Sequence, residues 1–63
     1  MDELRRYRLI YGNRFKSAFD VVHVWAEHRA EAVQLGRVQL HWRHLAAYAP
    51  EAWELVGLGE VPR

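Results

Sequence analysis

The chain has 63 residues, two prolines and no cysteine, and its nine basic and eight acidic side chains leave a formal net charge of +1. The lack of cysteine excludes disulfides and thiolate zinc sites, and the near-neutral charge excludes a DNA mimic or a strongly basic nucleic-acid protein. A fold of about 60 residues buries only about 60% of the surface that its unfolded chain exposes, so stability must come from a well-packed core, from oligomerisation or from a partner. Hydrophobic residues make up 51% of the chain, which favours a folded domain over a disordered one.

The first 26 residues predict a β-hairpin. Residues 4–11 (LRRYRLIY) alternate in part and predict a first strand. Three of its side chains share one side of that strand: Tyr7, Leu9 and Tyr11. Gly12-Asn13 supplies turn chemistry, because both residues tolerate positive φ. Residues 16–26 (KSAFDVVHVWA) are dense in β-branched and aromatic side chains and predict a second, longer strand.

The second half of the chain predicts one helix followed by a third strand. Residues 28–49 contain a single glycine and are rich in Ala, Leu, Arg, Glu and Gln, which favour a helix that ends before Pro50. Residues 52–58 (AWELVGL) return to strand character. The order strand–strand–helix–strand predicts an α+β fold, one domain over residues 1–63, in which a helix packs across a three-stranded sheet. We expect the third strand to pair with the first.

The predicted helix carries two apolar stripes. The stripe that we assign to the core is formed by Ala32, Val33, Gly36, Leu40 and Ala47. A second stripe, called the helix stripe below, lies nearly opposite and consists of Leu35, Val38, Trp42 and Leu45. A helix on one small sheet buries only one side, so the helix stripe predicts a partner-binding surface. The alternative is a helix that bends near Gly36 or Leu40 and buries both stripes.

The segment FDVVHVWAEHRAEAVQLGRVQL resembles the centre of the small RNA polymerase inhibitors made by T7-like phages. The matching positions are an aromatic-acid-Val strand at 19–21, aromatic-Ala-Glu at 25–27, a helix led by Glu-Ala at 31–36 and aromatic-Glu-apolar at 53–55. The resemblance covers roughly residues 7–58. It departs at residues 22–23, where one extra residue suggests a bulge in the second strand, and at 41–50, which lengthen the helix. It also departs on the last strand, where the arginines of that family would fall near Gly57 and Gly59.

The resemblance implies a non-enzymatic phage-type protein that inhibits bacterial RNA polymerase by occupying a nucleic-acid channel or a subunit surface. An anti-CRISPR inhibitor of an effector complex is the alternative in the same class. The residues that we expect to bind the partner are the helix stripe together with Arg6, Arg8 and Arg14. A homo-oligomeric structural protein, a homodimer through the helix, is a further alternative. Without a signal peptide or a membrane-length apolar run, we expect a cytoplasmic protein that does not enter a membrane.

The basic hairpin supports a different alternative, a small nucleic-acid-binding domain. Five of the nine basic residues lie within the first 16 positions. Arg6 and Arg8 project from one side of the first strand, with Tyr7 and Tyr11 interleaved, and a sheet with arginines and aromatics can bind single-stranded nucleic acid. The same arginines also suit an acidic protein surface, or serve to protect an edge strand from aggregation.

Two groups of residues have side chains of the types found in metal sites and in catalytic sites. His41 and His44 are three positions apart, but a zinc site would need further ligands such as His28 or Glu51. The second group is Asp20 with His23, a candidate acid–base pair. The pair has no serine nearby except Ser17, and the chain has no glycine-rich phosphate loop, so we expect no metal, no cofactor and no enzymatic activity.

Overall fold

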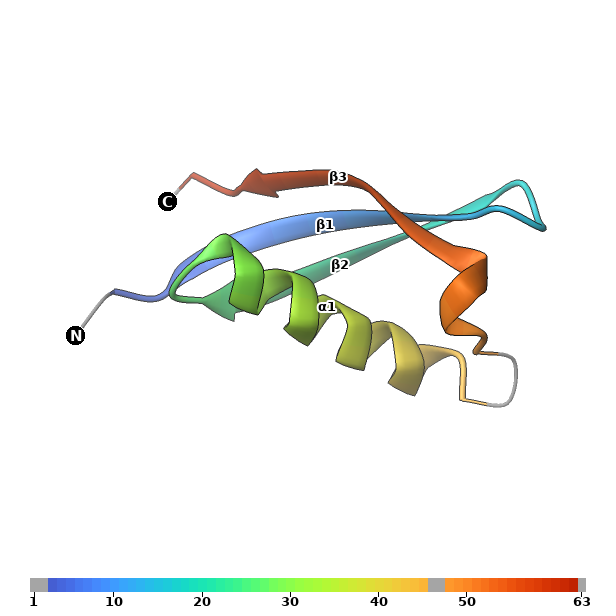
Figure 1. Cartoon of the computed structure of the whole chain (residues 1–63). Helices are drawn as coiled ribbons and strands as arrows, with labels where there is room; N and C mark the ends of the chain where they lie inside the picture. Colours follow the sequence, from blue (N-terminus) through green and yellow to red (C-terminus); the bar gives the residue numbers. More distant parts are fainter. Residues whose placement is uncertain (1–2, 46–47, 63) are drawn as a thin grey trace.

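The computed structural model describes residues 3–45 and 48–62, which form a three-stranded antiparallel sheet with one helix across one face (Figure 1). The elements in chain order are β1 (Arg5–Asn13), β2 (Ala18–Ala26), α1 (Arg29–Arg43), the short 3-10 helix η1 (Pro50–Ala52) and β3 (Trp53–Glu60). The strand order is β2-β1-β3, so the first strand is central and pairs with both others. The predicted α+β class, the β-β-α-β order and the pairing of the third strand with the first are confirmed.

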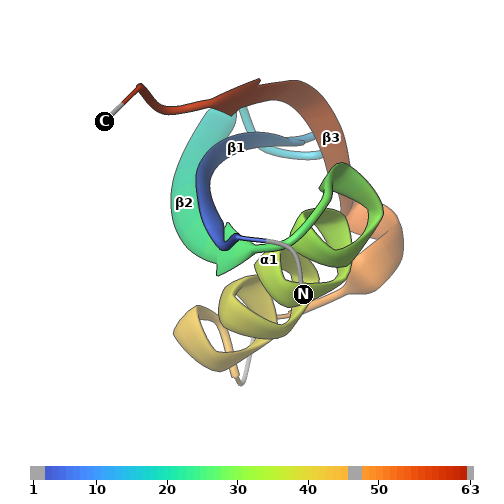
Figure 2. The same ribbon diagram turned by 90° about the vertical axis from the view of Figure 1, so that its left-hand side faces the viewer.

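The sheet is curved, and α1 lies across its open side (Figure 2). β2 and β3 are each antiparallel to β1, so they run parallel to each other with β1 between them. We call the face toward α1 the concave face and the other the convex face. Because side chains alternate along a strand, every second residue of β1 and β2 points to the convex face, and no helix or strand of residues 3–45 and 48–62 covers that face.

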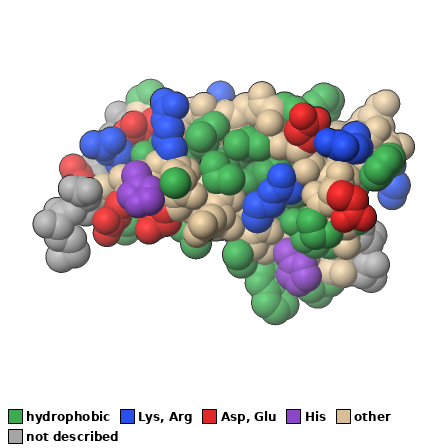
Figure 3. Space-filling view, in the orientation of Figure 1, with side chains coloured by type: hydrophobic (Ala, Val, Ile, Leu, Met, Phe, Trp, Pro, Cys, Tyr) green, Lys and Arg blue, Asp and Glu red, His purple; other side chains and the backbone are tan. Residues whose placement is uncertain are grey.

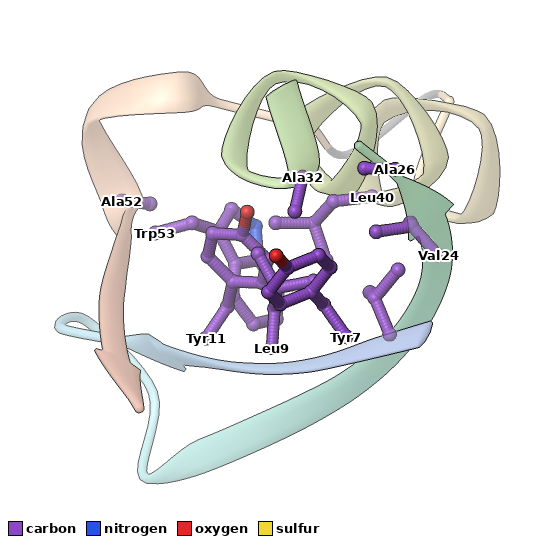
Figure 4. Close-up of a cluster of buried hydrophobic side chains, with 10 residues drawn as sticks. Tyr7, Leu9, Tyr11, Val24, Ala26, Ala32, Leu40, Ala52 and Trp53 are labelled. Atoms are coloured by element: carbon purple, nitrogen blue, oxygen red, sulfur yellow. The ribbon is translucent and has the colours of Figure 1, made fainter. Parts of the chain in front are cut away.

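The core fills the space between the concave face and α1 (Figure 4). The first strand contributes the three side chains predicted to share one side, Tyr7, Leu9 and Tyr11, and all are buried. The remaining buried hydrophobic residues among those described are Val22, Val24, Ala26, Ala32, Leu40, Ala52 and Trp53. Of the stripe assigned to the core, Ala32, Gly36 and Leu40 are buried and Val33 is partly buried, whereas Ala47 lies outside the described residues.

Tyr11 ties β1 to α1 through its hydroxyl and its ring. The hydroxyl donates a hydrogen bond to the Val33 carbonyl at 3.2 Å, and the Arg37 guanidinium lies 5.0 Å from the ring centroid. Burial raises the pKa of this hydroxyl, and the charge of Arg37 opposes part of that rise. Arg37 also donates to the Trp53 carbonyl at 3.0 Å, so one side chain of α1 contacts both β1 and the start of β3.

The turn between β1 and β2 differs from the prediction. Gly12 and Asn13 are the last paired residues of β1, opposite Phe19 and Ala18, so the turn spans residues 14–17. The Asn13 side-chain oxygen accepts hydrogen bonds from the backbone N–H groups of Phe15 (2.9 Å) and Lys16 (3.0 Å). No described residue has positive φ, so the prediction of a Gly-Asn turn is wrong. Asn13 organises the turn with its side chain rather than with a left-handed backbone.

The helix is unbroken but shorter than predicted. At its start, the His28 ring accepts from the Glu31 N–H (3.3 Å), and the Glu31 carboxylate accepts from the Glu27 N–H (3.0 Å), in the manner of a capping box. It ends at Arg43, where the His44 N–H bonds to the carbonyls of the preceding turn. Residues 44–45 and 48–49 are not helical, so the prediction of helix through residue 49 is wrong there, while residues 46–47 lie outside the described residues. No bend occurs near residues 36–40.

The bulge lies in a different strand from the one predicted. The β1–β2 register runs without interruption through residues 22–23. The register shifts instead between β1 and β3, where Ile10 pairs with Gly57 and Tyr11 with Leu55, leaving Val56 as the extra residue. Because a bulge adds local twist, it accompanies the curvature of the sheet at β3.

Candidate binding surfaces

The helix stripe points away from the core. The side of α1 that faces the sheet carries the small or buried residues Ala32, Gly36 and Leu40. The exposed fractions of the helix stripe are 38% for Leu35, 51% for Val38, 66% for Trp42 and 59% for Leu45. Hydrophobic side chains gather at the C-terminal end of α1 in Figure 3. Since α1 is unbroken and these side chains are exposed, the alternative of a bent helix with both stripes in the core is wrong.

Burial of the exposed helix stripe against a partner would contribute favourable binding free energy. Fully burying a Val, Leu or Phe-sized side chain contributes about 1.5–3 kcal/mol relative to leaving it in water. Leu35, Val38 and Trp42 lie on one side of α1, and Leu45 follows in the turn after the helix ends at Arg43, so the prediction that Leu45 is helical is wrong. A groove on another protein that covered the three helical side chains would therefore gain several such contributions from one rigid element, and Leu45 lies next to them in the chain.

A second exposed surface covers the convex face of the sheet. We call it the sheet patch; its residues are Arg6, Arg8, Phe19, Val21, His23 and Trp25. They stand in cross-strand pairs, Arg6 opposite Trp25 and Arg8 opposite His23. The exposed fractions of its two aromatic side chains are 72% for Phe19 and 54% for Trp25. The convex face thus combines cations with aromatic rings.

The structure does not bring the predicted contact residues together. Arg6 and Arg8 project from the convex face, whereas α1 packs on the concave face, so the sheet lies between them and the helix stripe. Arg14 lies in the hairpin turn and pairs with Glu54 at 3.9 Å. The seven residues expected to form one contact set are therefore divided between two surfaces and the hairpin turn.

The aromatic partners of the arginines are also different from those predicted. Tyr7 and Tyr11, expected to interleave with Arg6 and Arg8, are buried on the concave face. The rings that share a face with the arginines are Phe19 and Trp25 of β2. The alternation of residues 19–25 could have indicated this, because Val22, Val24 and Ala26 occupy the opposite side of that strand.

A polar cluster joins the end of α1 to β2. The Asp20 carboxylate accepts a hydrogen bond from Arg43 at 2.6 Å and lies 2.9 Å from His44 Nε2. Arg43 also donates to the Val21 carbonyl at 2.8 Å, and Gln39 donates to the His23 carbonyl at 3.3 Å. These bonds occupy carbonyl groups on the free edge of β2, which would otherwise be open to pairing with another strand.

The proposed chemical sites are not assembled. Asp20 contacts His44 and Arg43, whereas His23 points to the convex face, so the two are not an acid–base pair. The His41 ring packs edge-on against Tyr48, with the centroids 5.1 Å apart, whereas the His44 ring contacts Asp20. Across residues 3–45 and 48–62, no group of three or more His, Asp or Glu side chains is placed to hold a metal ion.

Comparisons with protein-family models, with curated proteins and with solved structures found no match for this chain. Within the described ranges, α1 is too short and too polar to cross a membrane.

Proposed function

We propose that the protein is a small, non-enzymatic binding protein that docks on a partner protein through the helix stripe. The observation that carries the proposal is the exposure of Leu35, Val38 and Trp42 along one side of a helix that is anchored to the sheet by its other side, with Leu45 exposed just beyond the helix end. An amphipathic helix that lays its apolar side chains into a groove is a recurring mode of protein recognition, with anchors three and four residues apart.

Trp42 is the expected centre of this interface. Tryptophan is enriched among the few residues that carry most of the binding energy in protein interfaces. Trp42 is the most exposed member of the stripe, and its one described ring contact is with His41, an edge-on contact with the centroids 5.9 Å apart. Its indole is therefore available to a partner without a change in the fold.

We propose bacterial RNA polymerase as the first partner to test, because the sequence resembles phage inhibitors of that enzyme over residues 7–58. A CRISPR effector complex is the second partner in the same class. In either case the protein would act by steric occupation of a subunit surface or a nucleic-acid channel. A second copy of the chain is the competing occupant of the helix stripe, and a stable dimer at low concentration would favour it.

The test compares the native chain with Trp42→Ala for binding to purified bacterial RNA polymerase and for inhibition of transcription in vitro. A hot-spot tryptophan gives a loss of affinity of about 30-fold or more on truncation. Phe15→Ala is the matched control, since Phe15 is an exposed aromatic in the hairpin turn, outside the helix stripe. Affinity capture from bacterial lysate with both variants, read by mass spectrometry, extends the same comparison to other partners. Equal capture by the native chain and Trp42→Ala would contradict the proposal.

A further inference from the structure

The convex face has the composition of a ligand site rather than of an ordinary solvated sheet. Two aromatic side chains, Phe19 and Trp25, stand six residues apart on β2, which spans roughly 20 Å along an extended strand. Both are more than half exposed, although aromatic side chains gain most when they are covered. An exposed apolar surface of this kind, rimmed by charge, typically marks a binding site.

On its β1 and β2 part this face carries charge of one sign; Glu54 of β3, opposite Gly12, is an acid at the other end of the face and pairs with Arg14. The residues of β1 and β2 that point to the convex face, all within the described part of the chain, include Arg6 and Arg8 and no acid. Neither arginine makes an ion pair with another described residue, whereas Arg5 and Arg14 pair with Glu60 and Glu54 at 3.9 Å. Arg6 and Arg8 therefore remain available to a negatively charged ligand.

Two glycines of β3 leave the convex face without side chains beside Ile10 and Arg8 of β1. Gly57 and Gly59 pair with Ile10 and Arg8, and a Cβ built on Gly59 would meet no atom within 4 Å. Beside it lies a hollow of about 110 Å³, lined by Arg8, Gly59, Glu60, Val61 and Pro62. Glycine inside a strand often marks a place where a ligand approaches the backbone closely. Gly57 directly follows the bulge residue Val56, which accounts for a glycine there, whereas Gly59 lies beyond the bulge and has no positive φ.

We propose that the sheet patch binds single-stranded nucleic acid, with bases stacked on Trp25 and Phe19 and phosphates held by Arg6 and Arg8. Sheets that present aromatic rings stack about two or three unpaired bases in this way, and arginines follow the backbone. Stacking requires an unpaired base, so a duplex does not fit the site. The site lies on the opposite side of the sheet from α1 and does not depend on the helix stripe.

The experiment is fluorescence anisotropy of labelled oligothymidylate and oligouridylate titrated with the full chain, with a duplex of the same length as comparison. Trp25→Ala is expected to weaken single-strand binding by about 5- to 150-fold, and Trp25→Phe to restore most of it. With two phosphate contacts, the log of the affinity falls with the log of salt at a slope of about −1.4, and Arg8→Ala reduces that slope by about 0.7. Circular dichroism checks that each variant is folded.

Gly59→Val provides a second test that does not remove a side chain. The valine has room and an ordinary strand backbone, so the fold should be kept while the approach to Arg8 is blocked, and the affinity should fall. Trp42→Ala should bind oligonucleotide like the native chain, which separates this site from the helix stripe. Three results would overturn the inference: no oligonucleotide binding at low salt, equal affinity for the duplex, or full affinity in Trp25→Ala. Binding of polyglutamate with the same sensitivity to Trp25→Ala and Gly59→Val, in place of oligonucleotide, would identify an acidic protein as the occupant instead.

Discussion

Gly36 is the residue at which α1 passes over the Tyr11 side chain. A Cβ at this position would stand 2.6 Å from the Tyr11 hydroxyl oxygen and 3.1 Å from Leu9 Cδ2. Both neighbours are fully buried, and the Tyr11 hydroxyl is held by its bond to the Val33 carbonyl. The absence of a side chain at residue 36, not a special backbone conformation, sets how closely the helix approaches the sheet.

Gly36→Ala is therefore expected to destabilise the protein although alanine is the better helix former. The gain in helix propensity is about 1 kcal/mol, and overpacking a fixed core costs about 1–3 kcal/mol. The free energy of unfolding, measured by urea denaturation, should fall by about 1 kcal/mol. Gly59→Ala is the matched control, because its Cβ meets nothing and its stability should be equal or slightly higher. A more stable Gly36→Ala would mean that Tyr11 moves aside freely.

At the scale of elements, the periodicity of the sequence predicted the strands and the helix, whereas tertiary contacts decided where the helix ends. Alternation in residues 4–11 and 16–26 identified the hairpin and the buried side of β1. The C-terminal end of the helix could not be predicted in this way, because residues 44–49 have helical composition. The end at Arg43 is accompanied by contacts between Asp20 and His44, 24 positions apart, and by packing of the His44 ring on Trp53.

The two candidate binding surfaces also differ in how far the sequence could predict them. Leu35, Val38 and Trp42 of the helix stripe could be predicted because they share a period within α1, whereas Leu45 lies beyond the end of the helix. The sheet patch could not be assembled from β1 alone, since its aromatic rings come from β2 and the pairing register decides which side chains meet. A one-residue change in that register would have placed Phe19 and Trp25 opposite residues that point into the core.

Asp20→Ala tests how far the polar cluster fixes the end of α1. The change removes the acceptor of Arg43 and the contact of His44, both partly exposed, so a loss of about 1 kcal/mol in unfolding free energy is expected. Amide exchange at Arg43 and His44 should accelerate more than exchange at the start of α1. Glu54→Ala removes a longer, more exposed pair with Arg14 and should change stability by less than about 0.5 kcal/mol. Equal effects of the two changes would mean that the cluster does not hold the helix end.

At the scale of the whole molecule, the chain divides its three tryptophans between structure and surface. Trp53 is 7% exposed, packs with the core and lies against the His44 ring at 5.0 Å. Trp42 and Trp25 are exposed on the helix stripe and the sheet patch. A domain of this size gains only about 3–5 kcal/mol from its core, so it cannot lose one large buried side chain and remain folded.

Trp53→Ala and Trp42→Ala should therefore have opposite outcomes. Truncating a buried tryptophan costs about 3–5 kcal/mol, which equals the whole stability expected here, so Trp53→Ala should be largely unfolded at room temperature. Trp42→Ala removes a side chain that is 66% exposed and substitutes the best helix former, so its melting temperature should stay within a few degrees of the native value. Far-ultraviolet circular dichroism with thermal melting measures both. If Trp42→Ala unfolds the chain, the helix stripe belongs to a core or to a dimer, and a mass measurement of the native chain by light scattering decides between the two.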